Sequence, residues 1–176
     1  MVRFLTSIGL VLSLFAATAA ISAGAPPQLS GKSVHVSWTD SRVERADDGH
    51  ELSMTQTSRM KIYVSDKGRI FSQLDRSVSA GQARQDLDVS GGGGSVLNFH
   101  AQGNQLVADQ ISAGGARRVT ITFDASFTSC SINVVNGASG KRARHLNLAK
   151  TRWLELVSIA VTSTSCSIAA GNAFGN

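Results

Sequence analysis

Apolar and polar residues alternate along much of the chain, and this alternation limits the possible fold more than any other feature. Residues 34–39 read VHVSWT, residues 60–64 read MKIYV and residues 118–123 read RVTITF. A period of two is typical of a β-strand that buries one face and exposes the other. We therefore expect the apolar side of each strand to form the core, and the core set predicted in this way is Val36, Trp38, Ile62, Val64, Val119, Ile121 and Phe123.

Short turn sequences separate the alternating stretches. DKG at 66–68 and QGN at 102–104 join neighbouring strands, and Gly68 suits the left-handed position of a three-residue hairpin loop. Successive hairpins form an antiparallel meander, and about eight strands are enough for a sheet to close or to fold over. The predicted fold is all-β, a small barrel or, as the alternative, a two-sheet β-sandwich. We predict its strands near 33–40, 58–65, 69–74, 95–101, 105–111, 117–124, 128–135 and 153–169.

Two stretches lack this alternation and are predicted to be loops. Residues 78–95 contain four consecutive glycines and should be a mobile loop. Residues 41–57 are polar and include Asp47-Asp48-Gly49. A short helix is possible at 142–150, where apolar residues fit helical spacing, whereas β-branched residues favour a strand from Trp153 onward.

The first 25 residues have the order of a secretory signal peptide. Arg3 supplies a positive charge, residues 4–15 are almost wholly apolar, and small residues follow at 16–20. An uncleaved anchor is the alternative, because the apolar character continues to Ala25. We expect a cleaved N-terminal signal helix at 1–25 and one all-β domain at 26–176. The mature protein should be secreted or periplasmic, with no membrane span after signal cleavage.

The chain has only two cysteines, Cys130 and Cys166, and each lies in the sequence TSCSI. In an oxidising compartment an even number of cysteines usually forms bridges, so we predict a disulfide bond. Free thiols and a metal pair are the alternatives, although a zinc site needs about four ligands at close spacing. The matching flanks suggest two paired antiparallel strands in which Cys130 lies directly opposite Cys166.

Four segments of the chain resemble those of a group of small secreted bacterial proteins of unknown function. They are GKSVHVSWTDSR at 31–42, IYVSDKGRIFSQ at 62–73, RRVTITFDASFTSC at 117–130 and SCSIAAGNAF at 165–174. The resemblance covers most of the chain after the signal segment. None of these segments is a chemical motif, so the resemblance implies no activity and no catalytic residue.

The remaining motifs do not predict catalysis, a cofactor or a metal. Gly31-Lys32-Ser33 lacks the earlier glycine and the strand–helix context of a phosphate-binding loop. The acidic cluster at 47–51 lacks the ligand spacing of a calcium loop. The histidines lie in separate segments, at His35, His50, His100 and His145. We therefore expect no catalytic residue, no cofactor and no metal site.

Positive charge is the strongest indication of a binding function. The net charge is +5, and five basic residues and no acid lie within 141–152. Two more arginines open the strand predicted at 117–124, and a hairpin with 128–135 would bring both basic groups to one end of the molecule. The predicted polyanion-binding residues are Arg117, Arg118, Lys141, Arg142, Arg144, Lys150 and Arg152.

The sequence favours an exported, non-catalytic β-domain that binds anionic polysaccharide, lipopolysaccharide or another polyanion. Specific nucleic-acid binding is not expected, because few aromatic residues lie among the basic ones. One alternative is a small barrel that holds an apolar ligand in a cavity lined by Trp38, Phe71, Phe99 and Phe123. An enzyme with an unrecognised site is the second alternative.

Overall fold

A computed structural model describes residues 24–80, 83–88, 97–112, 115–137, 142–144 and 153–175. The described residues form one short 3-10 helix and ten β-strands. The helix is η1 (Pro27–Leu29), and the strands are β1 (Lys32–Ala46), β2 (Glu51–Val64), β3 (Ile70–Ala80), β4 (Ala83–Asp88), β5 (His100–Gln102), β6 (Gln105–Ser112), β7 (Gly115–Phe123), β8 (Cys130–Gly137), β9 (Arg142–Arg144) and β10 (Trp153–Ala170).

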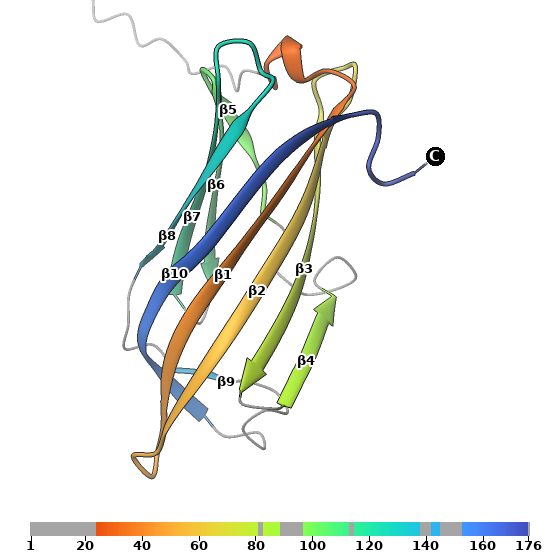
Figure 1. Cartoon of the computed structure of the whole chain (residues 1–176). Helices are drawn as coiled ribbons and strands as arrows, with labels where there is room; N and C mark the ends of the chain where they lie inside the picture. Colours follow the sequence, from red (N-terminus) through yellow and green to blue (C-terminus); the bar gives the residue numbers. More distant parts are fainter. Residues whose placement is uncertain are drawn as a thin grey trace, which may run out of the picture.

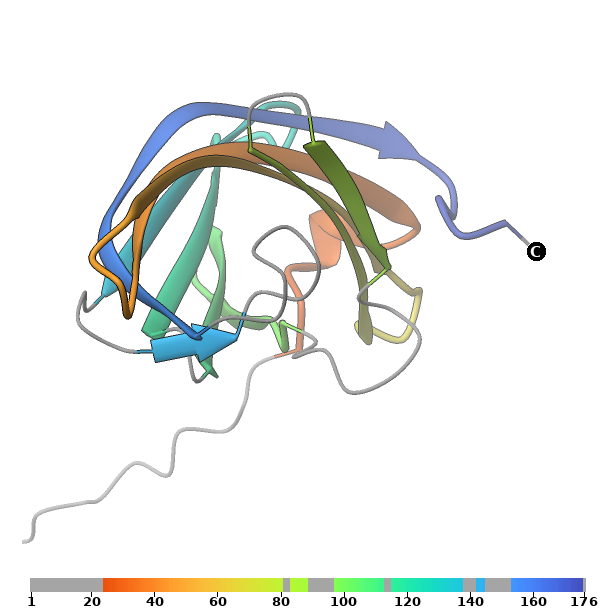
Figure 2. The same cartoon turned by 90° about the horizontal axis from the view of Figure 1, so that it is seen from below.

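The strands form two antiparallel sheets. The larger, here called sheet A, has the order β4-β3-β2-β1-β10-β9, and the smaller, sheet B, has the order β5-β6-β7-β8. The long strands of sheet A lie side by side in Figure 1, and Figure 2 shows sheet A curving over sheet B. The prediction of an all-β antiparallel fold is confirmed.

The arrangement is the two-sheet alternative and not a closed barrel. β1 is hydrogen-bonded to β2 on one side and to β10 on the other, so the last strand returns beside the first. Within the described part of the chain, the outer strands β5 and β8 of sheet B pair with one neighbour each. The two sheets therefore meet through side chains, as in a sandwich.

One end of the space between the sheets is filled by apolar side chains. All seven predicted core residues are buried, with Trp38 and Phe123 the largest of them. Leu29 of η1, Leu97 and Leu106 belong to the same cluster. The alternation in the sequence therefore predicted the correct inward face of β1, β2 and β7.

The predicted loop at 41–57 is wrong, because β1 and β2 continue through it and leave only a turn at 47–50. Gly49 has φ of +82° in that turn, a backbone conformation that suits glycine. The alternation persists in these strands, but several inward positions are polar: Asp40, Arg42, Glu44 and Gln56 are all buried. A search for apolar periodicity misses strands of this kind.

Other boundaries also differ from the sequence-based expectations. Residues 78–80 end β3 and residues 83–88 form β4, while 81–82 and 89–96 lie outside the described residues. β5 begins only at His100, and Arg142–Arg144 is a strand and not the start of a helix. The predicted signal segment lies almost entirely outside the described residues and stays a prediction. Among the described residues no helix has the length and apolar character needed to span a membrane.

Candidate functional site

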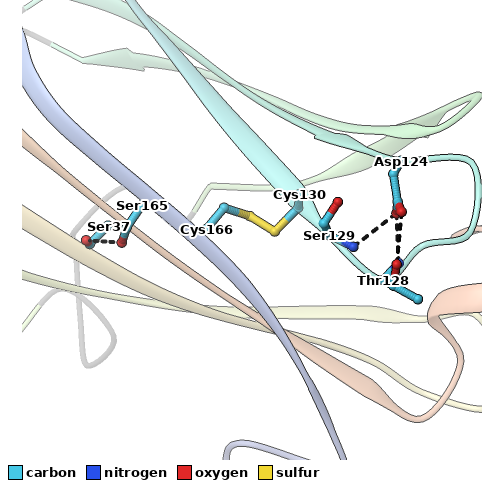
Figure 3. The surroundings of a disulfide bond; sticks show 7 residues. All are labelled: Ser37, Asp124, Thr128, Ser129, Cys130, Ser165 and Cys166. Atoms are coloured by element: carbon cyan, nitrogen blue, oxygen red, sulfur yellow. Dashed lines mark hydrogen bonds between the residues drawn. A yellow bond between two sulfur atoms is a disulfide. The ribbon is translucent and has the colours of Figure 1, made fainter.

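Cys130 and Cys166 form a disulfide bond with their α-carbons 5.6 Å apart, which confirms the predicted bridge. The predicted register is wrong, since the two strands are not paired. Cys130 of β8 lies opposite Phe123 of β7, and Cys166 of β10 lies opposite Val36 of β1. The bond therefore joins sheet B to sheet A across the sandwich, as Figure 3 shows.

Asp124 holds the β7–β8 turn beside this disulfide (Figure 3). Its carboxylate accepts hydrogen bonds from the Ser126 hydroxyl at 2.6 Å and from the backbone N–H groups of Thr128 and Ser129 at 2.8 and 3.0 Å. These hydrogen bonds, from Ser126 first and then from Ser129 and Thr128, hold the pKa of Asp124 far below its usual range. These hydrogen bonds stabilise the turn, and residues 124–129 contain no second acidic residue.

A network of buried polar residues joins the two sheets further along the sandwich. Asp40 on β1 is fully buried and accepts hydrogen bonds from Arg117 Nη2 at 2.8 Å and from Asn136 Nδ2 at 3.1 Å. Arg117 also donates to Asn136 Oδ1 at 2.6 Å, and its guanidinium lies 5.6 Å from the centre of the Trp38 ring. Burial lowers the pKa of Arg117, and the Asp40 charge opposes that shift.

Further buried polar residues lie next to Asp40 on the inner face of sheet A. Arg42 donates to Gln56 at 3.0 Å and forms an ion pair with Glu44 at 3.1 Å. Arg76 on β3 donates to Gln110 on β6 at 3.2 Å. Burial, together with the charges of Arg117 and Arg42, lowers the pKa of Arg76 to about 10, so the group stays a cation at neutral pH. We interpret these contacts as a polar connection that aligns the sheets.

The residues of the predicted polyanion surface lie in different environments. Arg117 is only 11% exposed at its side chain and is bound to Asp40, whereas Arg118 is exposed and forms an ion pair with Asp109 at 2.7 Å. Arg142 and Arg144 belong to β9, an outer strand of sheet A, and their side chains lie outside the described residues. Lys141, Lys150 and Arg152 lie wholly outside them. The surface as a whole stays a prediction.

A basic depression that the sequence analysis missed lies on the outer face of sheet A. It has a volume of about 290 Å³, and its floor is built from two cross-strand rows. One row runs Ser165–Ser37–Arg59–Asp75 and the next runs Ser167–His35–Lys61, each from β10 across β1 and β2. Arg59 and Lys61 are exposed, and neither forms an ion pair with any described residue.

The hydroxyl groups in these rows add polar partners next to the cations. The Ser37 and Ser165 hydroxyls are 2.8 Å apart and hydrogen-bonded to each other (Figure 3). Asp75 lies opposite Arg59 in the register and is the one acid among the described residues that line the depression. The depression therefore combines two cations, a histidine and serine hydroxyls around a single carboxylate, which favours anions over cations.

An aromatic groove of about 670 Å³ adjoins the basic depression on the same face. Tyr63 follows Lys61 by two residues on β2 and lies directly opposite Phe71 on β3. Their ring centres are 6.4 Å apart and their planes differ by 25°. Phe71 is 48% exposed, and Phe174 from the C-terminal turn, which also lines the groove, is 38% exposed. Exposed aromatic side chains gathered in a groove usually mark an interaction site.

Hydrogen bonds to β1 hold the C-terminal turn against the groove. Ser33 on β1 donates to the Gly171 carbonyl at 2.7 Å and accepts the Ala173 N–H at 2.9 Å. Asn172 accepts the Phe174 N–H at 3.0 Å and donates to the Gly175 carbonyl at 3.1 Å. The position of Phe174 is thereby tied to β1, which is a connection that the sequence does not signal.

In the part of the chain that the structure describes, no group of histidine, cysteine or acidic residues is placed to hold a metal ion. Comparison with family models, with curated proteins and with solved structures finds no match for this chain. The functional interpretation therefore depends on the chemistry of the surfaces described above.

Proposed function

We propose that this protein is an exported, non-catalytic β-domain that binds an anionic polymer on the outer face of sheet A. The observation that carries the proposal is the exposed pair Arg59 and Lys61, which form no ion pair with a described residue and lie among serine hydroxyls. Two adjacent cations on a rigid sheet attract a chain of anionic groups through a field that extends beyond direct contact.

The filled core supports a surface site over an internal one. Trp38 and Phe123, which would line an apolar ligand cavity, are packed in the core cluster, and Phe99 lies against it. Phe71, the fourth residue of that alternative, lies on the outer face. The Cys130–Cys166 bond supports an exported protein, because such bonds persist in oxidising compartments.

The basic segment 141–152 is a second candidate surface for the same function. Its strand β9 pairs Arg144 with Trp153 and Arg142 with Glu155, at the opposite end of β10 from Ser165 and Ser167. The described part of this second surface, Arg142–Arg144, is thus separated from Arg59 and Lys61 along the length of the sheet, and variants can distinguish the two.

The test measures binding to heparin, a convenient anionic polymer, as a function of salt concentration. Each lost cation–anion contact should reduce the slope of log K against log salt by about one, because fewer counterions are released. We expect Arg59→Gln/Lys61→Gln to weaken binding and to lower that slope by about two. The matched variant Lys141→Gln/Arg142→Gln/Arg144→Gln should retain the wild-type slope.

The opposite result would assign polymer binding to the second candidate surface. If the 141–144 variant loses the salt dependence while Arg59→Gln/Lys61→Gln retains it, the basic segment binds the polymer and the outer face of sheet A does not. Wild-type protein that fails to bind heparin at low ionic strength would refute the proposed function. Thermal unfolding of each variant controls for folding, since exposed charges contribute little to stability.

A further inference from the structure

We infer that the anionic polymer is an acidic polysaccharide, and that the aromatic groove of Tyr63, Phe71 and Phe174 holds one of its sugar rings. This inference rests on the proposed function and specifies its partner. It starts from the position of the groove, whose Tyr63 lies one cross-strand row beyond Lys61 on the same outward face of β2.

The floor of the groove is suited to the face of a pyranose ring. Aromatic faces carry negative charge density and attract the slightly positive C–H groups that a sugar ring presents on its face. Tyr63 and Phe71 form a cross-strand pair with nearly parallel rings, and both line the groove, where Phe71 is half exposed. Phe174 adds a third ring from the C-terminal turn.

The rest of the lining is suited to the hydroxyl groups of a sugar. Ser65, Ser72, Gln73 and Asn172 complete the described lining of the groove, and none of the described lining residues carries a charge. An apolar floor with uncharged polar groups around it matches a ring that has C–H groups on its face and hydroxyls at its edge. A bare lipid chain would contact the aromatic floor and form no hydrogen bond with the polar groups around it.

The neighbouring cations indicate that the polysaccharide is acidic. Tyr63, Lys61 and Arg59 occupy alternate positions of one strand, so successive side chains are about 7 Å apart along it. A polysaccharide whose ring stacks at Tyr63 therefore continues over Lys61 and Arg59, where a carboxylate finds a cation. The extended strand fixes this order of an aromatic contact followed by ionic contacts.

The charge of the surface favours a polysaccharide over single-stranded nucleic acid. Nucleic acid also stacks on aromatic residues, but it carries a phosphate at every nucleotide and is bound by grooves with cations along their length. Here the aromatic end is uncharged, and Asp75 offsets part of the charge of Arg59 and Lys61. The described residues of this surface therefore do not provide the continuous row of cations on which single-stranded nucleic acid binding depends.

The test compares three probes, namely polygalacturonate, neutral dextran and oligo-dT, with wild type and with Phe71→Thr. Threonine retains β-propensity, and Phe71 is half-exposed, so the variant should fold. We expect Phe71→Thr to weaken polygalacturonate binding about tenfold through the lost aromatic contact, with an unchanged salt slope. The matched control is Val135→Thr, which removes an apolar side chain that is 52% exposed on β8 in sheet B and should bind like wild type. Dextran should bind far more weakly than polygalacturonate.

The outcomes separate this inference from the proposed function. If Phe71→Thr binds polygalacturonate like wild type while Arg59→Gln/Lys61→Gln still loses binding, the sugar-stacking inference is wrong and the anionic-polymer proposal stands. If oligo-dT binds more tightly than polygalacturonate and depends on Phe71, the partner class is wrong. If neither Phe71→Thr nor Arg59→Gln/Lys61→Gln alters polygalacturonate binding, both proposals fail.

Discussion

The replacement Asp40→Asn tests how the two sheets are held together. Asp40 is fully buried and is the carboxylate that faces the Arg117 guanidinium at 2.8 Å. Asparagine has nearly the same shape, so the substitution removes a charge and leaves the packing intact. Arg117 then stays as a buried cation whose pKa burial already lowers, with the Arg42 charge acting in the same direction.

The expected loss of stability follows from the burial of the Asp40–Arg117 pair. Removing one partner of a buried ion pair typically costs about 3–5 kcal/mol, because the other charge stays desolvated and uncompensated. With an m-value of about 2 kcal/mol per molar urea, that loss lowers the unfolding midpoint by about 1.5–2.5 M. The assay is equilibrium urea unfolding at neutral pH with the disulfide intact.

The exposed ion pair between Arg118 and Asp109 provides a matched control. Arg118 pairs with Asp109 at 2.7 Å, but their side chains are 61% and 47% exposed, so Asp109→Asn should cost less than about 1 kcal/mol. Removing the cation as well, in Asp40→Asn/Arg117→Gln, should recover part of the loss. If Asp40→Asn lowers the free energy of unfolding no more than Asp109→Asn does, the buried pair is not what aligns the sheets.

Two further predictions concern the region around the disulfide. Replacing both Cys130 and Cys166 by serine should lower the free energy of unfolding by about 4 kcal/mol, because the 36-residue separation is no longer closed in the unfolded chain. Unfolding of the wild type with and without reductant measures the same loss. Equal stability of the wild type in both conditions would contradict the prediction. Asp124 has a pKa below its unfolded value of about 3.9, so its stabilising effect is present above that pH and is lost as pH falls through the folded pKa. The stability difference between wild type and Asp124→Asn should therefore shrink on acidification below about pH 4, and a difference that stays constant down to pH 2 would show that the carboxylate charge is not responsible.

The core was predictable from the sequence because alternation is a local property of each strand. Val34, Val36 and Trp38 show the inward phase of β1 with no information from the rest of the chain, and all three are buried. The same phase continues through Asp40, Arg42 and Glu44, but polar residues at inward positions resemble a loop when only apolar periodicity is followed. Asp40 is buried against partners from β7 and β8, and Arg42 is bound to Gln56 of β2, which no local pattern shows.

The alternation of β7 distinguishes its two arginines, which a count of basic residues does not. Arg117 shares the parity of Val119, Ile121 and Phe123, which are all buried, so strand alternation places it inward and Arg118 outward. The two arginines therefore do not belong to one surface cluster, although they are adjacent in the sequence. The pairing of the two cysteines was predictable from composition and compartment, whereas their placement on different sheets was not, since a bridge between sheets leaves the same alternation as a bridge within one.

The candidate site was predictable only in part. Tyr63 and Phe71 lie in the solvent-facing phase of the hairpin around Gly68, and two large aromatic residues in that phase are a signal for an exposed site. Phe174 gives no such signal, because its position depends on the hydrogen bonds between Ser33 and the C-terminal turn. Arg59 and Lys61 were hidden because each is a single basic residue in a strand and not part of a charged run.

The inner and outer faces of sheet A thus have separate roles. Alternate positions of β1 and β2 carry the contacts that hold the sheets together inside, and the positions between them carry the aromatic and basic residues outside. A slip of one residue in the β2 register would exchange the two faces of that strand. The hydrogen bonds of the buried Gln56 with Arg42 and Asp40, and the burial of Met60, Ile62 and Val64, oppose such a slip. The spacing of Tyr63, Lys61 and Arg59 is therefore fixed by interactions to which these three residues do not contribute. This arrangement lets the outer residues be replaced without loss of the fold, and it is why the binding variants and the stability variants can be interpreted independently.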